Sequence, residues 1–295
     1  MNNITGVYTA IVTPFSASGE LDGVALREQV KRQQQAGNNI FCNGTNGEFF
    51  MLNEQEKIRV TEICLEAAGS DTGVMSHVGE ISTSATIRLG KHIETLGVRA
   101  VSVITPWFAT LRPQELIAHF RAVADALTVP VYLYNIPART GNTLTPAIVR
   151  ELANHPNIKG IKDSAGSWES LQGFHEVSKQ FTDFSVLTGP DSLIYRGFTE
   201  GSIGCISGIA NIIPAQVNAV YRHLQEKNAA AAEAVQADIN QIRTHLYGIA
   251  FSPAVVKKAV NLLGYNVGES RYPVDFTQDD TNKILAVIKD FNLRG

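Results

Sequence analysis

The chain has 295 residues, of which 44% are hydrophobic and 18% are charged, and its formal net charge is −3 at pH 7. This length and composition are typical of a globular enzyme that buries its core without the help of disulfides or metals. The slightly acidic balance lacks the basic surface of nucleic-acid-binding proteins, so we expect no nucleic-acid partner.

Cysteine usage and the N-terminal segment indicate the compartment. The three cysteines, Cys42, Cys64 and Cys205, are far apart and form no C-x-x-C pair. Reduced thiols are therefore expected, not a disulfide framework or a zinc site. Residues 1–5 show no basic segment followed by an apolar stretch, and no apolar run reaches the roughly 18 residues of a membrane span. We expect a cytoplasmic protein without a membrane partner.

Short apolar runs alternate along the chain with longer segments of helical period. The runs predict eight strands, at Gly6–Thr13, Asn39–Cys42, Gly73–Val78, Ala100–Ile104, Val129–Tyr134, Ile158–Lys162, Phe184–Leu187 and Ile203–Ile206. The longer segments predict helices at Gly23–Ala36, Asn53–Ala68, Thr83–Leu96, Pro113–Ala126, Thr145–Ala153, Trp168–Lys179, Leu193–Phe198 and Pro214–Gln225.

Eight strand–helix units give either a closed barrel or a doubly wound sheet. A dinucleotide-binding sheet carries G-x-G-x-x-G after its first strand, whereas Thr13-Pro14-Phe15 stands at that place here. The pattern favours an α/β fold, a (β/α)₈ TIM barrel over residues 1–226. A C-terminal helical extension, residues 227–295, is expected to pack on the barrel; its helices are predicted at Ala229–Leu246, Pro253–Leu263 and Gln278–Phe291.

Catalytic groups in such barrels gather at the carboxyl ends of the strands. The sixth strand reads Ile158-Lys159-Gly160-Ile161-Lys162. Its period of two places Gly160 and Lys162 on one face and Lys159 on the other. A lysine at the end of an apolar strand either reaches solvent or pairs with the neighbouring Asp163, or it is a desolvated amine nucleophile.

Two further segments end strands with polar groups. Tyr134 closes the fifth strand; a tyrosine there is usually part of the core, but beside a nucleophilic lysine its phenol could move protons. The loop Asn43–Glu48 follows the second strand and sets Thr45 and Asn46 between two glycines. Most such loops are simple turns, yet backbone N–H groups freed by glycine can also bind an anion such as a carboxylate.

The seven histidines do not form metal sites by their spacing. They are His77, His92, His119, His155, His175, His223 and His245, and no two stand at metal-ligand spacing. A zinc-dependent aldolase is therefore disfavoured, and no metal is expected. His77 could end the third strand near the candidate site, although a structural histidine is the more common case.

Three segments together, Gly44–Glu48, Tyr134–Pro137 and Gly160–Asp163, resemble the dihydrodipicolinate synthase / N-acetylneuraminate lyase family, as do Thr9–Phe15 and Gly204–Ser207. The resemblance implies a pyruvate-dependent class I aldolase, usually a homotetramer built as a dimer of dimers, with no metal or organic cofactor. It further implies that Lys162 forms a Schiff base with pyruvate, that Tyr134 relays protons with Thr45 beside it, and that Thr45, Asn46 and Gly47 hold the carboxylate.

The branch of the family depends on a few positions. Arg139 matches the synthase arginine that meets the carboxylate of aspartate semialdehyde. However, the synthase pattern has a second threonine at Asn46 and two tyrosines at Trp107-Phe108, and one of those tyrosines reaches the neighbouring subunit. The Thr–Tyr–Tyr relay of the synthases therefore cannot form here.

Other positions resemble the sugar-acid lyases. Asp191 and Ser207, with Ile206 before it, stand where that branch binds a hydroxylated tail. Ser192 replaces the glutamate of the sialic acid lyases, which argues against sialic acid itself. We therefore expect a carbon–carbon or carbon–oxygen lyase, foremost one that cleaves or condenses a hydroxylated 2-keto acid, such as a 2-keto-3-deoxy sugar acid, to pyruvate and an aldehyde. A related dehydratase would use the same lysine but lose water instead of an aldehyde. The alternative is the synthase reaction of lysine biosynthesis, which condenses pyruvate with aspartate semialdehyde. A more remote alternative is a non-catalytic paralogue that binds 2-keto acids.

Overall fold

The computed structural model describes residues 4–294, and it contains a closed barrel of eight strands in chain order. The strands are β1 (Gly6–Ala10), β2 (Asn39–Cys42), β3 (Val74–His77), β4 (Ala100–Ile104), β5 (Val131–Asn135), β6 (Ile158–Asp163), β7 (Ser185–Thr188) and β8 (Gly204–Ser207). Neighbours from β3 to β8, and β1 with β2, pair in parallel. The expected (β/α)₈ barrel is thus confirmed.

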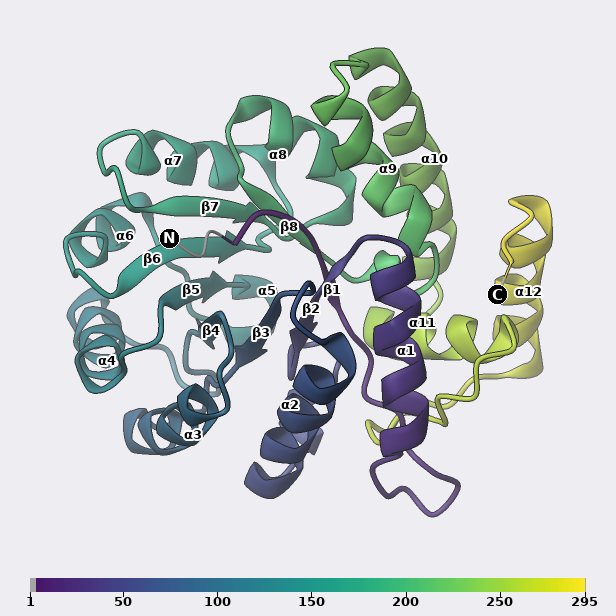
Figure 1. The fold of residues 1–295 in the computed structure, drawn as a ribbon, viewed down its shortest axis with the longest axis horizontal. Coiled ribbons are helices and arrows are strands. Elements are labelled where there is room, and N and C mark those ends of the chain that lie inside the picture. Colours follow the sequence, from purple (N-terminus) through teal and green to yellow (C-terminus); the bar gives the residue numbers. More distant parts are fainter. Residues whose placement is uncertain (1–3, 295) are drawn as a thin grey trace. The chain divides into compact units, whose positions relative to one another are not determined.

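The chain forms two compact units. Figure 1 labels the helices and strands that belong to them. The first comprises residues 4–6 and Gly73–Ile206, and the second comprises Val7–Thr72 and residues 207–294. The C-terminal helices thus share a unit with β1 and β2. The domain boundary expected at residue 226 stays a prediction, and so does the reading of the N-terminus, because residues 1–3 lie outside the described part.

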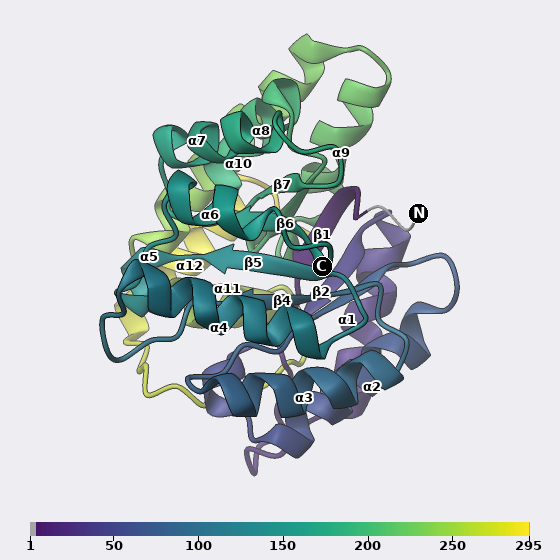
Figure 2. The same cartoon turned by 90° about the vertical axis from the view of Figure 1, so that its left-hand side faces the viewer.

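Helices line the strands of the first unit. They are α3 (Thr83–Thr95), α4 (Pro113–Ala126), α5 (Pro137–Thr140), α6 (Pro146–Leu152), α7 (Trp168–Ser178) and α8 (Ile194–Glu200). Figures 1 and 2 show α4, α6 and α7 running along one side of the strands. Strands β4 and β5 are buried at every position, because helices cover one face and the barrel interior the other.

Local sequence explains where several of these helices begin. The side chains of Ser82, Thr145 and Ser167 each accept a hydrogen bond from a backbone N–H in the first turn of α3, α6 and α7. Pro113 and Pro146 occupy the first turn of their helices, where a missing N–H costs nothing. These caps fix the residue at which each helix begins.

The second unit is mainly helical around β1 and β2. Its helices are α1 (Gly23–Gln35), α2 (Glu54–Ala68), α9 (Pro214–Gln225), α10 (Ala229–Tyr247), α11 (Ser252–Leu262) and α12 (Gln278–Asp290). Helix α1 packs on α2, α10 packs on α9, and α11 contacts both α10 and α12. Helix α11 also packs on the short 3₁₀ helix η3 (Ile209–Asn211). The C-terminal helices therefore form part of this unit's core.

Strand β1 is shorter than the sequence predicts, ending at Ala10 and not at Thr13. The N–H of Ile11 still donates to Phe41 on β2, at 3.0 Å. The next N–H, that of Val12, donates instead to the side chain of Asn211, at 3.0 Å. The Asn211 amide in turn donates to the carbonyl of Ala10, at 2.8 Å. The side chain of Asn211 thus replaces the neighbouring strand as the hydrogen-bond partner of the backbone at Ala10 and Val12.

Four short elements were not predicted: α5, η3, η1 (Phe49–Met51) and η2 (Asp191–Leu193). Segments of three or four residues are too short to show a helical period, which explains the omission. Among residues 4–294, no helix is long and apolar enough to span a membrane. In the same part of the chain, no group of three or more His, Cys, Asp or Glu side chains is placed to hold a metal ion.

Acid should destabilise the fold through His119 on α4. Its Nδ1 lies 2.9 Å from the hydroxyl of Thr83, and burial lowers the pKa of His119 to about 4. The unfolded chain binds a proton near pH 6.5, and the folded histidine binds it only near pH 4. The free energy of unfolding should therefore fall by about 3 kcal/mol between these pH values.

Urea denaturation from pH 7 to pH 4 measures this effect. His119→Gln, which keeps a polar side chain toward Thr83 but does not titrate, should flatten the pH dependence. The control His92→Gln removes an exposed histidine and should leave the slope as in the wild type. An unchanged slope in His119→Gln would rule out this explanation.

Candidate active site

Lys162 and Tyr134 form the centre of the candidate site in the first unit. They are directly paired across strands β5 and β6. Both side chains are buried, with 4% of Lys162 and 1% of Tyr134 exposed. The Nζ atom of Lys162 lies 3.9 Å from the centroid of the Tyr134 ring. A lysine amine is thus held out of water against an aromatic face.

Gly160 lies two residues before Lys162 on β6, where the neighbouring strands leave no room for a side chain. A Cβ atom at Gly160 would lie 2.4 Å from the carbonyl oxygen of Ser185 and 2.6 Å from the ring of Tyr132. Any larger residue would therefore collide with its neighbours. Lys159 has its amine 3.6 Å from the carboxylate of Asp183. The register of β6 on β5 shifts between Ile158 and Gly160, so the separation of the two lysines by strand parity stays a prediction.

His77, at the end of β3, lies next to Tyr134. The two rings are 5.9 Å apart and nearly perpendicular, at 89°. His77 is buried, and a Cβ atom at Gly79 would lie only 2.7 Å from its ring. Two sequence signals singled out this histidine: its place at a strand end, and the likeness of residues 77–79 to the third-strand end of the sugar-acid lyases. In the structure it is a wall of the candidate site.

A second cross-strand pair lies one residue beyond Tyr134 and Lys162. The side-chain amide of Asn135 donates to the carboxylate of Asp163, at 2.8 Å, and its oxygen accepts from the N–H of Leu144, at 3.0 Å. The same carboxylate oxygen accepts from the N–H of Ala165, at 3.2 Å. Burial raises the pKa of Asp163, while these hydrogen bonds oppose the rise. This pair links the two strand ends that carry Tyr134 and Lys162.

The remaining predicted residues of this unit differ in burial. Asp191 begins η2 after β7 and is 5% exposed. Burial raises the pKa of the Cys205 thiol, and the nearby Asp191 charge raises it further. Ile206 is buried at the end of β8. Arg139, in contrast, is exposed on α5. The structure thus places Asp191 and Ile206 in the interior and Arg139 at the surface.

In the second unit, the predicted carboxylate loop is a tight turn. The N–H of Glu48 donates to the carbonyl of Thr45, at 3.1 Å, and that of Phe49 donates to Gly44, at 3.3 Å. The hydroxyl of Thr13 donates to the carbonyl of Gly47, at 2.7 Å. A Cβ atom at Gly47 would lie 3.1 Å from that hydroxyl, so glycine permits the close approach.

The same unit brings Asn46 to the residues that follow β8. A Cβ atom at Gly208 would lie 2.7 Å from the Asn46 amide nitrogen and 3.2 Å from the Tyr247 hydroxyl. Ser207 is buried, and its hydroxyl accepts from the N–H of Ala210, at 3.1 Å. The structure thus groups Asn46 with Gly208, which no local sequence pattern could indicate.

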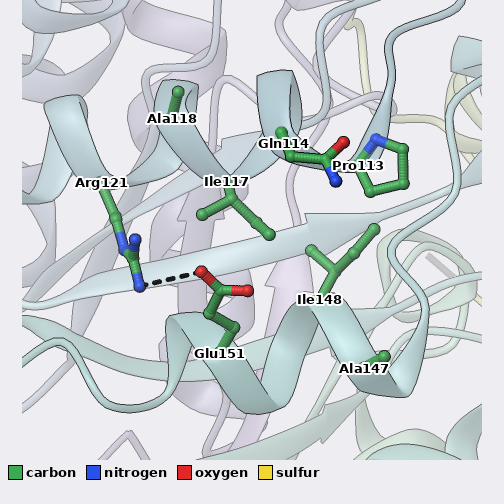
Figure 3. Close-up of a pocket in the computed structure, with 8 residues that line it drawn as sticks. All are labelled: Pro113, Gln114, Ile117, Ala118, Arg121, Ala147, Ile148 and Glu151. Atoms are coloured by element: carbon green, nitrogen blue, oxygen red, sulfur yellow. Dashed lines mark ion pairs between the residues drawn. The ribbon is translucent and has the colours of Figure 1, made fainter.

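A pocket of about 350 Å³ between α4 and α6 belongs to the helix layer and not to this site. Figure 3 shows its lining, which includes the ion pair between Arg121 and Glu151, with nitrogen and oxygen 3.1 Å apart. Both side chains of the pair are close to half exposed, so it contributes about 0–1 kcal/mol. No strand residue lines the pocket, and we assign it no role.

The Asn135–Asp163 pair can be tested by exchanging its members. Asn135→Asp sets two buried carboxylates against each other and should lower the free energy of unfolding by about 3 kcal/mol at pH 7. The double variant Asn135→Asp/Asp163→Asn recreates one donor and one carboxylate. It should recover most of the loss in urea denaturation. Equal losses in the single and double variants would show that the two side chains are not coupled.

Comparison with known proteins identifies the family. The model of the dihydrodipicolinate synthetase family matches residues 3–290. A 4-hydroxy-tetrahydrodipicolinate synthase of Methanosphaerula palustris is 34% identical over 285 residues, which cover 96% of each chain. The corresponding synthase of Methanospirillum hungatei is 32% identical over 288 residues, covering 96% of this chain and 97% of the relative.

A solved structure is similar over almost the whole chain. YagE from Escherichia coli K12, a prophage protein of the dihydrodipicolinic acid synthase family in complex with pyruvate, superposes with a TM-score of 0.94. The two sequences are 28% identical, and the match covers 98% of this chain and 99% of that one. The family model, the relatives and the barrel agree: this chain belongs to the dihydrodipicolinate synthetase family and is a lyase of that family.

Proposed function

We propose that this lyase forms a Schiff base between Lys162 and the ketone of pyruvate or a related 2-keto acid. The observation that carries the proposal is the buried amine of Lys162, 3.9 Å from the centre of the Tyr134 ring. An amine held out of bulk water beside a phenol is placed to act as a nucleophile on a ketone. The pyruvate complex of the similar YagE supports a keto acid as the ligand.

The proposed cleavage proceeds without any added oxidant or metal. The Lys162 amine adds to C2 of the keto acid, and the resulting carbinolamine loses water to give an imine. The imine accepts the electron pair of the C3–C4 bond as the C4 hydroxyl loses its proton and an aldehyde leaves. The remaining enamine takes a proton at C3, and water then releases pyruvate and free Lys162. The Tyr134 hydroxyl would carry the protons in these steps.

We assign the carboxylate of the keto acid to the loop Thr45–Gly47. The turn of this loop is held by the hydrogen bonds from Glu48 and Thr13 described above. Hydroxyl, amide and glycine backbone groups are suitable donors for an anion. The loop follows β2 and Lys162 lies near the end of β6, and barrels of this kind carry their catalytic groups at the carboxyl ends of strands.

Two reactions are candidates for the second substrate. The names of the relatives support condensation of pyruvate with aspartate semialdehyde. This reaction is the alternative prediction of the sequence analysis. Arg139 would serve the distal carboxylate of that aldehyde, and its exposure on α5 leaves it accessible.

Cleavage of a hydroxylated 2-keto acid is the second candidate. Asp191, buried next to Cys205, is a carboxylate suited to bind substrate hydroxyls, and Ser207 would bind the same tail. Trp107 and Phe108 have no hydroxyls for the tyrosine relay of the synthases. Membership in a lyase family leaves the non-catalytic paralogue without support.

We also propose that the chain assembles as a homotetramer. Phe108 follows β4, is 97% exposed and has a φ of 80°, a conformation uncommon for residues other than glycine. A large aromatic side chain in this position is suited to contact a second copy. Sedimentation velocity should give the mass of four chains, and a monomer at micromolar concentration would contradict the assembly.

Trapping with borohydride tests the Schiff base. Incubation with pyruvate and sodium borohydride should add one reduced pyruvyl group to the peptide that contains Lys162. Lys162→Arg should abolish the adduct, because the guanidinium is not a nucleophile. The matched control Lys159→Arg, at a lysine that pairs with Asp183, should be labelled like the wild type. An adduct that persists in Lys162→Arg would refute the mechanism.

Tyr134→Phe isolates the proton relay. It keeps the ring beside the Lys162 amine but removes the hydroxyl, so kcat should fall by about 10²–10⁴-fold. Borohydride trapping should become slower while remaining on Lys162. A kcat within threefold of the wild type would remove Tyr134 from the relay.

Rates with a panel of substrates decide between the two reactions. Purified protein is assayed with pyruvate plus aspartate semialdehyde, with pyruvate plus glyceraldehyde, and for cleavage of 2-keto-3-deoxy sugar acids. A kcat/KM above about 10⁴ M⁻¹s⁻¹ for aspartate semialdehyde, within the range of ordinary enzymes, would establish the synthase reaction. Comparable rates with the sugar acids alone would establish the cleavage.

A further inference from the structure

Glu48 adopts an unusual backbone conformation directly after the carboxylate loop. Its φ is 55°, in the left-handed region that residues other than glycine rarely enter. Its N–H closes the turn onto Thr45, and its carbonyl accepts from the N–H of Met51, at 2.8 Å. Such a conformation costs about 1–3 kcal/mol and persists only when the surroundings hold it.

The surroundings that hold Glu48 come from the C-terminal region. One carboxylate oxygen accepts from the Nζ of Lys257 on α11, at 2.9 Å. The other accepts from the Ser270 hydroxyl at 2.7 Å, the Arg271 N–H at 2.9 Å and the Tyr272 N–H at 3.2 Å. These donors stand 209 to 224 positions further along the chain. Only 1% of each side chain of the Glu48–Lys257 pair is exposed.

A compact charge cluster surrounds this carboxylate. The Lys257 amine and the Arg271 guanidinium lie 3.9 Å and 4.1 Å from the centroid of the Phe15 ring. Arg271 also donates to both carboxylate oxygens of Glu56, at 2.6 and 3.0 Å. Burial lowers the pKa of Lys257 to about 8, although the Glu48 charge opposes this. Two cations and two carboxylates therefore balance one another.

Such a cluster is better suited to fix geometry than to add stability. The desolvation of a buried ion pair offsets most of its attraction, so apolar replacements of similar volume are often as stable. Its fixed geometry, however, holds the residue that ends the carboxylate loop. At the other end of the loop, Asn43 donates to Lys57 and Thr61 of α2, at 2.9 and 3.0 Å. The loop is thus anchored at both ends.

We propose that Glu48 is a positioning residue for the keto-acid carboxylate loop, and that Lys257 and the segment Ser270–Tyr272 hold it in place. The inference rests on the proposed role of Thr45–Gly47 as the seat of the carboxylate. Glu48 itself does not touch the substrate. Without its partners the turn relaxes, the donors of the loop lose their alignment, and binding of the keto acid weakens. The chemistry on Lys162, which belongs to the other unit, is retained.

The test separates binding from chemistry. Lys257→Met and Glu48→Gln are each compared with the wild type in the reaction that the substrate panel identifies. The quantities measured are kcat, the KM for the keto acid, and the pyruvate concentration that gives half-maximal borohydride trapping. We expect KM and the half-saturating pyruvate concentration to rise about tenfold, with kcat changed by less than threefold, because the lost interaction is one of ground-state binding. The matched control Lys258→Met removes the exposed neighbouring pair with Glu269 and should leave both parameters unchanged.

The double variant Glu48→Gln/Lys257→Met distinguishes positioning from stability. Each single variant leaves a buried charge without its partner, so its melting temperature should drop. The double variant removes both charges and should recover the melting temperature, while its KM stays raised. Recovery of KM together with the melting temperature would assign Glu48 a structural role and overturn the proposal. Ser270→Ala, which removes one donor only, gives a milder variant if either single change prevents folding.

Two outcomes separate this proposal from the proposed function. If wild-type protein traps pyruvate on Lys162 but the folded Lys257→Met variant keeps its KM within twofold, only the role of Glu48 is refuted. If wild-type protein traps no pyruvate, the proposed function fails first and the role of Glu48 fails with it.

Discussion

The contact between the Lys162 amine and the Tyr134 ring is the constraint on which the rest of the site depends. It follows from two simple facts of strand geometry. Parallel pairing sets Tyr134 opposite Lys162, and the period of two turns both side chains to the same face. Both side chains are buried there, so little water reaches the amine. In the proposed mechanism, this placement lets a single lysine supply the nucleophile.

Both units hold their proposed reactive segments in the same way, through a buried polar side chain one residue further along. Asp163 follows Lys162 and is bound by Asn135 on the neighbouring strand. Glu48 follows Gly47 and is bound by Lys257 and the segment near Ser270. The hydrogen bonds that each buried carboxylate accepts allow few alternative arrangements of that side chain. Each carboxylate therefore restricts the positions of the residue before it.

Sequence alone predicted the barrel, its eight strands and most helix ends, because apolar period and capping residues are local signals. Its separation of Lys162 from Lys159 by strand parity stays a prediction. It could not predict the Glu48–Lys257 pair, whose members are 209 positions apart, nor the packing of Asn46 on Gly208. Long-range partners of this kind depend on tertiary structure. The order of the two candidate reactions was also beyond local patterns, because both use the same lysine and tyrosine.

The distance between Glu48 and its partners has a consequence for biosynthesis. A ribosome that adds about 5–20 residues per second reaches Lys257 roughly 10–40 s after Glu48. During that interval the Glu48 carboxylate has none of its C-terminal donors, and a left-handed backbone at this position is not supported. The loop after β2 can therefore reach its final form only late in translation. With the proposed role of Glu48, a nascent chain would carry the lysine of β6 for some time before its loop could hold a keto acid.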